Sequence, residues 1–274
     1  MGLQEIAPHL ILRFGAGLAI AALSFATFLQ LGHWRDSVSL LTHTIAAAGE
    51  SGEAHTLLGY AYQVKGDLEP ALAHYARARQ LQPNQVVAVN NTAMIYLLQG
   101  RWKEAEDIAR LAILLDPSSG GAYLNLGDAL DKQDRKTEAV EQYTAATRVQ
   151  PGLLTAYEKL GNAQLLLNHS PEAAAAYEAA TRLAPAKAIN WANLGVTMSS
   201  MGQFKEAQPV LRKAIALDPD SAYARYYLAL ALHLTGDQPA AIEELKKLVA
   251  VHPDNPEGSA LLQQLLQESR VPAK

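Results

Sequence analysis

The fold of this chain is decided by residues 188–221, AINWANLGVTMSSMGQFKEAQPVLRKAIALDPDS. This stretch carries one small residue, Gly195, in its first half and another, Ala207, in its second half, with Gly202 between them. Small side chains allow two helices to cross closely, and Pro219 then stops the second helix. The stretch therefore predicts a pair of antiparallel helices.

The same pattern recurs at a period of 34 residues, which is typical of a helical solenoid. Each unit has a small residue in its first helix, an alanine twelve residues later and a closing proline. The small residues are Gly59, Ala93, Gly127, Gly161, Gly195 and Ala229, the alanines Ala71, Ala105, Ala139, Ala173, Ala207 and Ala241, and the prolines Pro83, Pro117, Pro151, Pro185, Pro219 and Pro253. They define six repeats over residues 52–255, at 52–85, 86–119, 120–153, 154–187, 188–221 and 222–255.

The repeats resemble those of the tetratricopeptide family. Trp191-Ala-Asn-Leu-Gly195 is the fullest match to the first helix of that family's motif, and Gln142-Tyr-Thr-Ala-Ala146 matches the second helix. The resemblance implies an all-α fold, an α-solenoid in which helix-turn-helix repeats form a right-handed superhelix. It also implies that the first helices line a concave surface for ligand proteins or peptides.

Two further helices are expected beside the repeats. In the junction at 32–51, residues 36–48 match a second helix that has no tetratricopeptide first helix before it. Within 256–274, residues 256–269 form an amphipathic segment that predicts a capping helix, which covers the end of a solenoid.

After a short flank at residues 1–13, the segment 14–31 contains no charged residue. Eighteen residues at 1.5 Å each are just long enough to cross a hydrocarbon core of about 30 Å, so the segment predicts one transmembrane helix in the lipid bilayer. A signal peptide cleaved near Ser24-Phe25-Ala26 and a buried soluble helix are the alternatives.

Four small residues of this segment, Gly15, Ala19, Ala22 and Ala26, share one helix face and predict a packing face for another membrane-protein subunit. The alternative is that small residues are simply frequent in apolar helices. Arg13 and the terminal amine favour an amino terminus on the cytoplasmic side.

The stretch from Gln30 through Trp34-Arg-Asp-Ser37 also resembles a junction in polytopic, glycosyltransferase-like membrane proteins that carry tetratricopeptide repeats at their carboxyl end. This resemblance implies a single-pass membrane protein with its repeats on the periplasmic, non-cytoplasmic side. The polytopic catalytic portion is absent from the chain, so no transferase activity is carried over.

Composition argues against several kinds of site. The formal net charge is −4, which gives no general attraction to nucleic acid. Without cysteine, thiolate metal sites and cysteine nucleophiles are excluded. Five of the eight histidines, His55, His74, His169, His233 and His252, are scattered over different repeats. Glu104, Glu106 and Asp107 are expected at a helix start or solvent face. We therefore expect no catalytic, metal or cofactor site.

A candidate ligand surface comes from the position two residues before each small residue, occupied by Leu57, Asn91, Asn125, Lys159, Asn193 and Tyr227. An amide offers both a donor and an acceptor to a peptide backbone. We expect these asparagines to face inward, outside the packing between helices, although local packing alone is the alternative.

The tetratricopeptide resemblance identifies Asn162 and Asn193 with the two asparagines of a clamp for acidic carboxyl termini. Glu158 stands where a cation would be needed, so that clamp is not expected. The last repeat instead offers an aromatic platform for a ligand, or for the capping helix, at Tyr223, Tyr226 and Tyr227.

Together these features predict a membrane-anchored scaffold that binds a partner protein or peptide, and not an enzyme. The alternatives are an accessory subunit of a larger integral membrane complex and a regulatory fragment of a glycosyltransferase-like protein.

Overall fold

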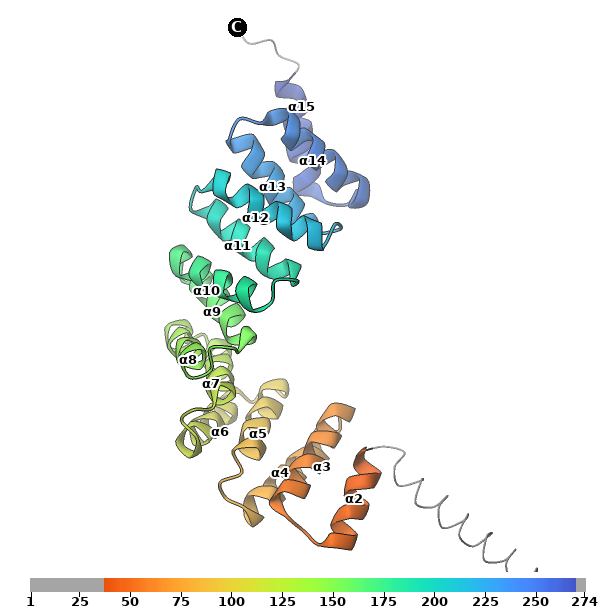
Figure 1. The fold of residues 1–274 in the computed structure, drawn as a ribbon, viewed down its shortest axis with the longest axis vertical. Coiled ribbons are helices and arrows are strands. Elements are labelled where there is room, and N and C mark those ends of the chain that lie inside the picture. Colours follow the sequence, from red (N-terminus) through yellow and green to blue (C-terminus); the bar gives the residue numbers. More distant parts are fainter. Residues whose placement is uncertain (1–36, 270–274) are drawn as a thin grey trace, which may run out of the picture. The chain divides into compact units, whose positions relative to one another are not determined.

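The computed structural model describes residues 37–269. Its regular structure in this range consists of fourteen α-helices and no strand, so the prediction of an all-helical solenoid is confirmed (Figure 1). The predicted transmembrane segment 14–31, with its packing face at Gly15, Ala19, Ala22 and Ala26, lies outside the described residues. None of the helices within 37–269 has both the length and the apolar character that a membrane crossing requires.

The chain divides into two compact units, with the boundary between Gln99 and Gly100. The boundary falls inside the second repeat, since α5 and α6 are its two helices. The first unit contains α2 (Ser37–Ala48), α3 (Gly52–Lys65), α4 (Leu68–Leu81) and α5 (Val86–Leu98). The second contains α6 (Trp102–Leu115), α7 (Gly120–Lys132), α8 (Lys136–Val149), α9 (Leu154–Leu166), α10 (Ser170–Leu183), α11 (Ala188–Ser200), α12 (Phe204–Leu217), α13 (Ala222–Leu234), α14 (Gln238–Val251) and α15 (Pro256–Glu268).

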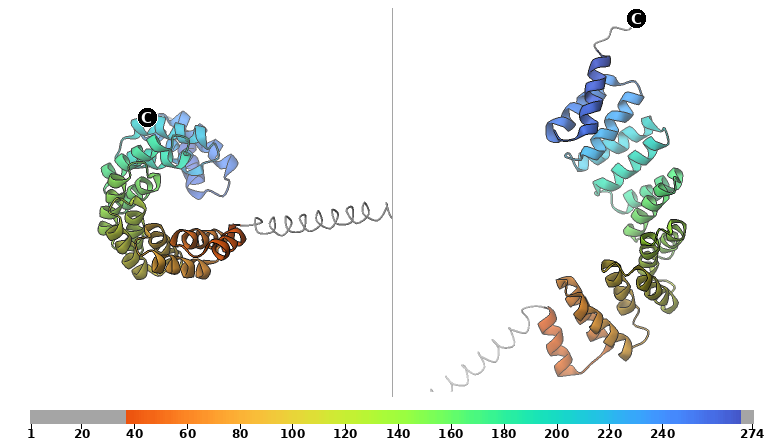
Figure 2. Two further views of the ribbon diagram at one scale, coloured as in Figure 1. Left: turned by 60° about the horizontal axis from the view of Figure 1, so that its bottom comes forward. Right: turned by 180° about the vertical axis from the view of Figure 1, so that it is seen from behind.

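Within the second unit, each helix from α7 onward packs against its neighbours in the chain, as two further views show (Figure 2). The small residues lie where paired helices cross. A Cβ atom added at Gly127 would lie 2.5 Å from Cε1 of Tyr143, and one added at Gly161 would lie 2.8 Å from Cε1 of Tyr177. These tyrosines are buried and fill the space that the glycines leave. The crossing points therefore have no room for a larger side chain.

The turn between the two helices of every repeat contains one residue in the left-handed backbone region. Glycine occupies this position in four repeats, at Gly66, Gly100, Gly202 and Gly236. Asp134 and Asn168 occupy it in the other two, with φ of 62° and 61°. Left-handed backbone is costly for most residues, but asparagine and aspartate adopt it more readily than others.

The prolines that close the repeats lie two residues after each second helix ends. The residue between, such as Gln82 or Asp116, has an extended backbone with φ near −140°. Proline disfavours helical backbone in the residue before it, which explains why every second helix ends at this point.

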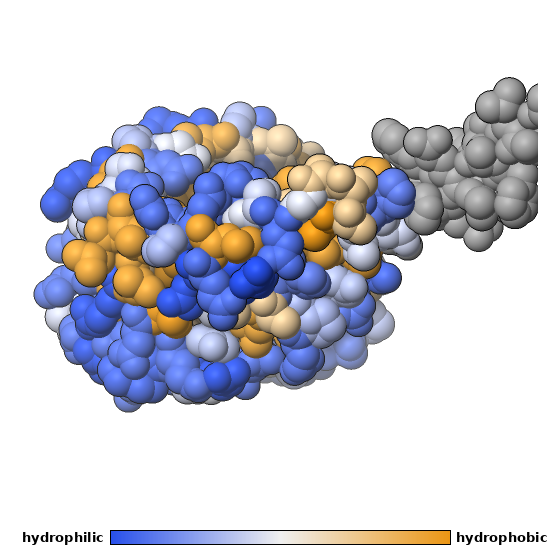
Figure 3. All heavy atoms as spheres, turned by 90° about the horizontal axis from the view of Figure 1, so that it is seen from below, coloured by the Kyte–Doolittle hydropathy of each residue, from blue (hydrophilic) through white to orange (hydrophobic). Residues whose placement is uncertain are grey.

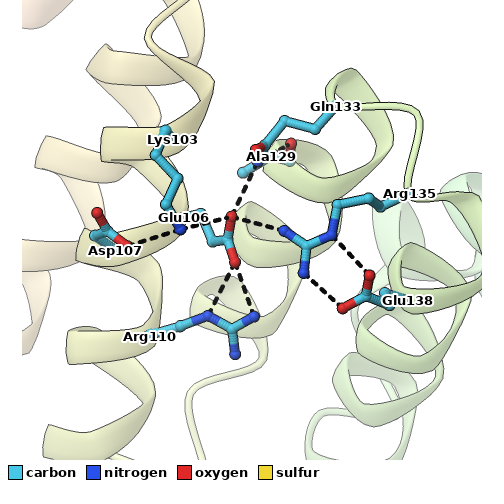
Figure 4. Close-up of polar contacts among 8 residues, drawn as sticks. All are labelled: Lys103, Glu106, Asp107, Arg110, Ala129, Gln133, Arg135 and Glu138. Atoms are coloured by element: carbon cyan, nitrogen blue, oxygen red, sulfur yellow. Dashed lines mark hydrogen bonds and ion pairs between the residues drawn. The ribbon is translucent and has the colours of Figure 1, made fainter.

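Glu106 is part of the packing between α6, α7 and α8, because only 2% of its surface is exposed (Figure 4). Its carboxylate accepts hydrogen bonds from Arg110 and Arg135, both at 2.9 Å, from Gln133 at 3.1 Å and from Lys103 at 3.3 Å. Burial alone would raise the pKa of Glu106, but these donors together lower it to about 2. The expectation that Glu106 lies on a solvent face or helix start was wrong. Its side chain is buried because it packs against the following repeat, where Gln133 and Arg135 bond to it.

Some first helices of neighbouring repeats contact each other: α3 with α5 in the first unit, and α7 with α9 and α11 with α13 in the second. We call the surface that these helices expose the inner face of each unit. In the first unit it carries exposed apolar side chains such as Leu57, Tyr60 and Val64. On the side of the molecule drawn in Figure 3, apolar side chains form separate patches among hydrophilic ones.

Candidate functional site

The asparagines predicted to bind a ligand are not equally available. Asn91 is half-buried, and its Nδ2 donates to Oη of Tyr75 at 3.1 Å. Asn125 is buried, with 8% of its surface exposed. The expectation that these two amides lie outside the packing between helices was therefore wrong.

Asn162 and Asn193, on α9 and α11, are the more accessible amides of the second unit. Asn162 is exposed, and its Oδ1 accepts a hydrogen bond from Oη of Tyr177 at 2.6 Å. That bond orients the amide and leaves its Nδ2 group to donate. Asn193 is half-buried, and its side chain makes no hydrogen bond to another described residue. Both amides can therefore bond to a peptide backbone.

Tyrosine hydroxyls reach the inner face from the core, a feature that the sequence analysis missed. Tyr143 and Tyr177 come from second helices, yet their Oη atoms donate to Asp128 at 2.7 Å and to Asn162 at 2.6 Å. Asp128 also pairs with Lys159, at 2.9 Å. Burial raises the pKa of Tyr177 to about 12, so its hydroxyl stays protonated and donates.

The family's clamp for acidic carboxyl termini is not assembled here. Glu158 lies one turn before Asn162, and its carboxylate pairs with Lys187 at 2.6 Å. The position that would need a cation therefore carries a carboxylate, and the nearby Lys187 is already paired with it.

The three predicted tyrosines meet at one end of the second unit. Tyr223, Tyr226 and Tyr227 of α13 line a pocket of about 400 Å³, together with Ala222, Asn255 and Glu257. The ring of Tyr227 lies 5.1 Å from that of Tyr223 and 5.4 Å from that of Tyr226, in edge-to-face contacts. The sequence analysis did not identify Asn255 and Glu257, which come from the start of the capping helix α15.

The platform remains open to a ligand even though the capping helix is present. Tyr223 is 43% exposed, while Tyr226 and Tyr227 are half-buried against the core of the last repeat. The tyrosines therefore pack against the core and also line a pocket, and ligand binding by the platform stays a prediction.

Two histidines meet in the first repeat. Nδ1 of His55 lies 2.9 Å from Nδ1 of His74, so one ring donates to the other. The ring of His74 also stacks on Tyr62 at 5.4 Å. The expectation that these histidines are scattered over different repeats was wrong, because both lie in the repeat at 52–85. Even so, residues 37–269 bring no three side chains of His, Asp or Glu together in a way that could hold a metal ion.

Paired helices that cross at small residues and repeat at a fixed period define a helical-repeat protein. Two family models described as tetratricopeptide repeat match the chain, one at residues 27–86, 66–122 and 124–188 and the other at residues 198–265. The chain belongs to the tetratricopeptide repeat family.

A curated relative is the small glutamine-rich tetratricopeptide repeat-containing protein 2 of Mycosarcoma maydis, which is 37% identical over 83 residues. The match covers 30% of this chain and 24% of that protein. The chain thus spans about a quarter of the length of the curated relative it matches.

Several solved structures share the fold. YrrB, described as a tetratricopeptide repeat protein with an unusual peptide-binding site, is 19% identical with a TM-score of 0.64, over 69% of this chain and 97% of YrrB. PilF of Pseudomonas aeruginosa is 19% identical with a TM-score of 0.65, over 78% of this chain and 97% of PilF. MamA is 25% identical with a TM-score of 0.54, over 60% of this chain and 96% of MamA.

Proposed function

We propose that this protein is a scaffold that binds an extended peptide segment of a partner protein on the inner face of its second unit. The observation that carries the proposal is the pocket of about 400 Å³ walled by Tyr223, Tyr226 and Tyr227. Aromatic side chains in a pocket provide much of the energy at protein interfaces, because they bury a large area and lose little conformational freedom.

The amides complement the pocket. Asn162 and Asn193 lie on α9 and α11, the first helices of the two repeats before α13. A peptide on this face can bond through its backbone to these amides and place one side chain in the tyrosine pocket. YrrB, which has a similar fold, is described as having a peptide-binding site, and this analogy supports the same class of ligand.

The test is selection from a random peptide library displayed on phage, with the full-length protein in detergent as the target. Tyr223→Ala combined with Tyr227→Ala should abolish most of the selected binding. Asn162→Ala combined with Asn193→Ala should weaken it by about 1–3 kcal/mol, from two hydrogen bonds of roughly 0.5–1.5 kcal/mol each. Circular dichroism checks that the variants fold.

Lys213→Ala is the matched control, because Lys213 is exposed on the second helix α12 and should not affect binding. Full binding by both inner-face variants would refute the proposal and make another surface the better candidate.

We further propose that residues 14–31 anchor the scaffold in a membrane, with the repeats on the non-cytoplasmic side. The support is the uncharged run of eighteen residues and the junction at Trp34-Arg-Asp-Ser37. Alkaline carbonate extraction tests the anchor, since release of the full-length protein into the supernatant would contradict it. An alkaline phosphatase fusion after Lys274 tests the side of the membrane.

A further inference from the structure

The walls of the tyrosine pocket face in different directions. The planes of Tyr223 and Tyr227 meet at 70°, and those of Tyr226 and Tyr227 at 86°. The face of an aromatic ring carries negative partial charge, and its edge carries positive partial charge. Because the rings are nearly perpendicular, their faces point in more than one direction, and a cation can bind against a face that no neighbouring ring edge covers.

A carboxylate completes the lining. Glu257 lies in the first turn of α15, is exposed, and forms no ion pair with any other residue of the described range 37–269. A carboxylate beside aromatic faces favours a positively charged occupant, because the carboxylate and the ring faces both attract a cation.

The helix ends beside the pocket do not reverse this preference. The amino termini of α13 and α15 carry partial positive charge. Their caps already use some of the free amide groups, because Oγ of Ser221 accepts from the amide of Ala224 at 3.3 Å and Oδ1 of Asn255 accepts from the amide of Gly258 at 2.7 Å. The full charge of Glu257 offsets the half charges of the two termini, and the ring faces then leave a preference for a cation.

The last repeat, which carries the pocket, is also acidic as a whole. Between Asp218 and Glu257 there are seven acidic and three basic residues, so this stretch has a formal charge of −4, equal to that of the whole chain. One of the basic residues, Arg225, is paired with Glu244 at 2.7 Å. A basic ligand would therefore be attracted to this end of the second unit in particular.

We propose that the tyrosine pocket binds the basic side chain, arginine or lysine, of the peptide that the inner face holds. This inference rests on the proposed function and specifies its ligand. The cation lies against the faces of the tyrosine rings, and Glu257 pairs with it at the pocket's edge. A volume of about 400 Å³ lies at the small end of the range for ligand pockets, which suits one side chain.

The test uses the peptides selected on the full-length protein. We expect them to share one arginine or lysine. For an arginine peptide, replacement of that residue by citrulline, which has a similar shape and no charge, should weaken binding about ten-fold by fluorescence anisotropy. A lysine peptide is tested in the same way with its acetyl-lysine form.

Protein variants assign the effect to this pocket. Glu257→Gln should weaken the charged peptide several-fold, with little change for the neutral one. Tyr227→Leu, which keeps apolar bulk without an aromatic face, should do the same, whereas Tyr227→Phe should bind nearly as well as the native protein. Glu206→Gln is the control, because Glu206 is exposed on α12.

The outcomes separate this inference from the proposed function. Selected peptides without a shared basic residue would overturn the inference and leave peptide binding intact. Equal binding of charged and neutral peptides, or an equal loss for both in Glu257→Gln, would also overturn it. If no peptide depends on Tyr223 and Tyr227, the proposed function fails and the inference fails with it.

Discussion

Replacing Glu106 by Gln should destabilise the second unit and remove much of its sensitivity to acid. In the folded protein the pKa of Glu106 is about 2, compared with an ordinary value of 4.5. At 1.36 kcal/mol for each pH unit of difference, the folded state favours the carboxylate by about 3 kcal/mol. Glutamine keeps the shape of the side chain but leaves Arg110 without a counter-charge and Arg135 with Glu138 alone, so a loss of this order is expected near neutral pH.

The sign of the pH dependence follows from the lowered pKa. The stabilisation is fully present above about pH 4.5, where the carboxylate is charged in both the folded and the unfolded state. It is lost as the pH falls through about 2, because the folded carboxylate must then be protonated. Wild-type stability should thus fall between these values more steeply than that of Glu106→Gln.

Urea unfolding followed by circular dichroism at several pH values measures this difference, with hydrogen exchange of α6, α7 and α8 as the local readout. Glu104→Gln is the matched control, since Glu104 lies on the same helix and pairs with Arg101 at the exposed surface. Exposed pairs contribute little, so that variant should keep nearly the stability of the wild type. Equal effects of the two substitutions would refute the assignment of a buried, charged Glu106.

Three further predictions concern the repeats. Gly161→Trp should destabilise the fold by about 1–3 kcal/mol or more in thermal unfolding, because even a Cβ atom would meet Tyr177. Gly152→Trp is the control, since no atom lies within 4 Å of a Cβ added there, and its stability should stay within about 0.5 kcal/mol of the wild type. Burial and the nearby charge of a second histidine lower the pKa of His74, so the stability of the first unit should fall as the pH drops below about 6.5. Urea unfolding at several pH values measures this loss of stability. If His74→Gln showed the same loss on acidification, the assignment to His74 would be contradicted. Asn168→Ala should cost about 1 kcal/mol because of its left-handed backbone, whereas an equal loss in Asn168→Gly would exclude backbone strain as the cause.

The helix pairs could be predicted from the sequence because steric requirements restrict the residue type at the helix crossings and at the helix ends. Gly127 and Gly161 are required where helices cross, and Pro151 cannot continue a helix, so all three recur at the same period. The aromatic platform was predicted on the same basis, since the repeat register places Tyr223 and Tyr227 on a first helix.

The burial of Glu106 and the position of Glu257 could not be predicted, because they depend on contacts that do not recur from repeat to repeat. The burial of Glu106 depends on Arg135, 29 residues later in the next repeat. Glu257 reached the pocket because the capping helix starts beside α13. Neither feature has a counterpart in the other repeats, so periodicity gave no signal for either of them.

Tyrosine hydroxyls extend from the core to the inner face, so the residue type in the core determines which polar groups are needed on that face. In the third and fourth repeats, a buried tyrosine bonds to a polar residue fifteen positions earlier in the chain. In the fifth and sixth repeats leucine takes the place of tyrosine, and the residue fifteen positions earlier is apolar. The pairs are Tyr143 with Asp128, Tyr177 with Asn162, Leu211 with Val196, and Leu245 with Leu230. A core tyrosine requires a partner at the surface, since an unpaired buried hydroxyl is costly. The polar groups that the inner face offers to a ligand can therefore be changed by replacing one buried residue together with its partner fifteen positions earlier.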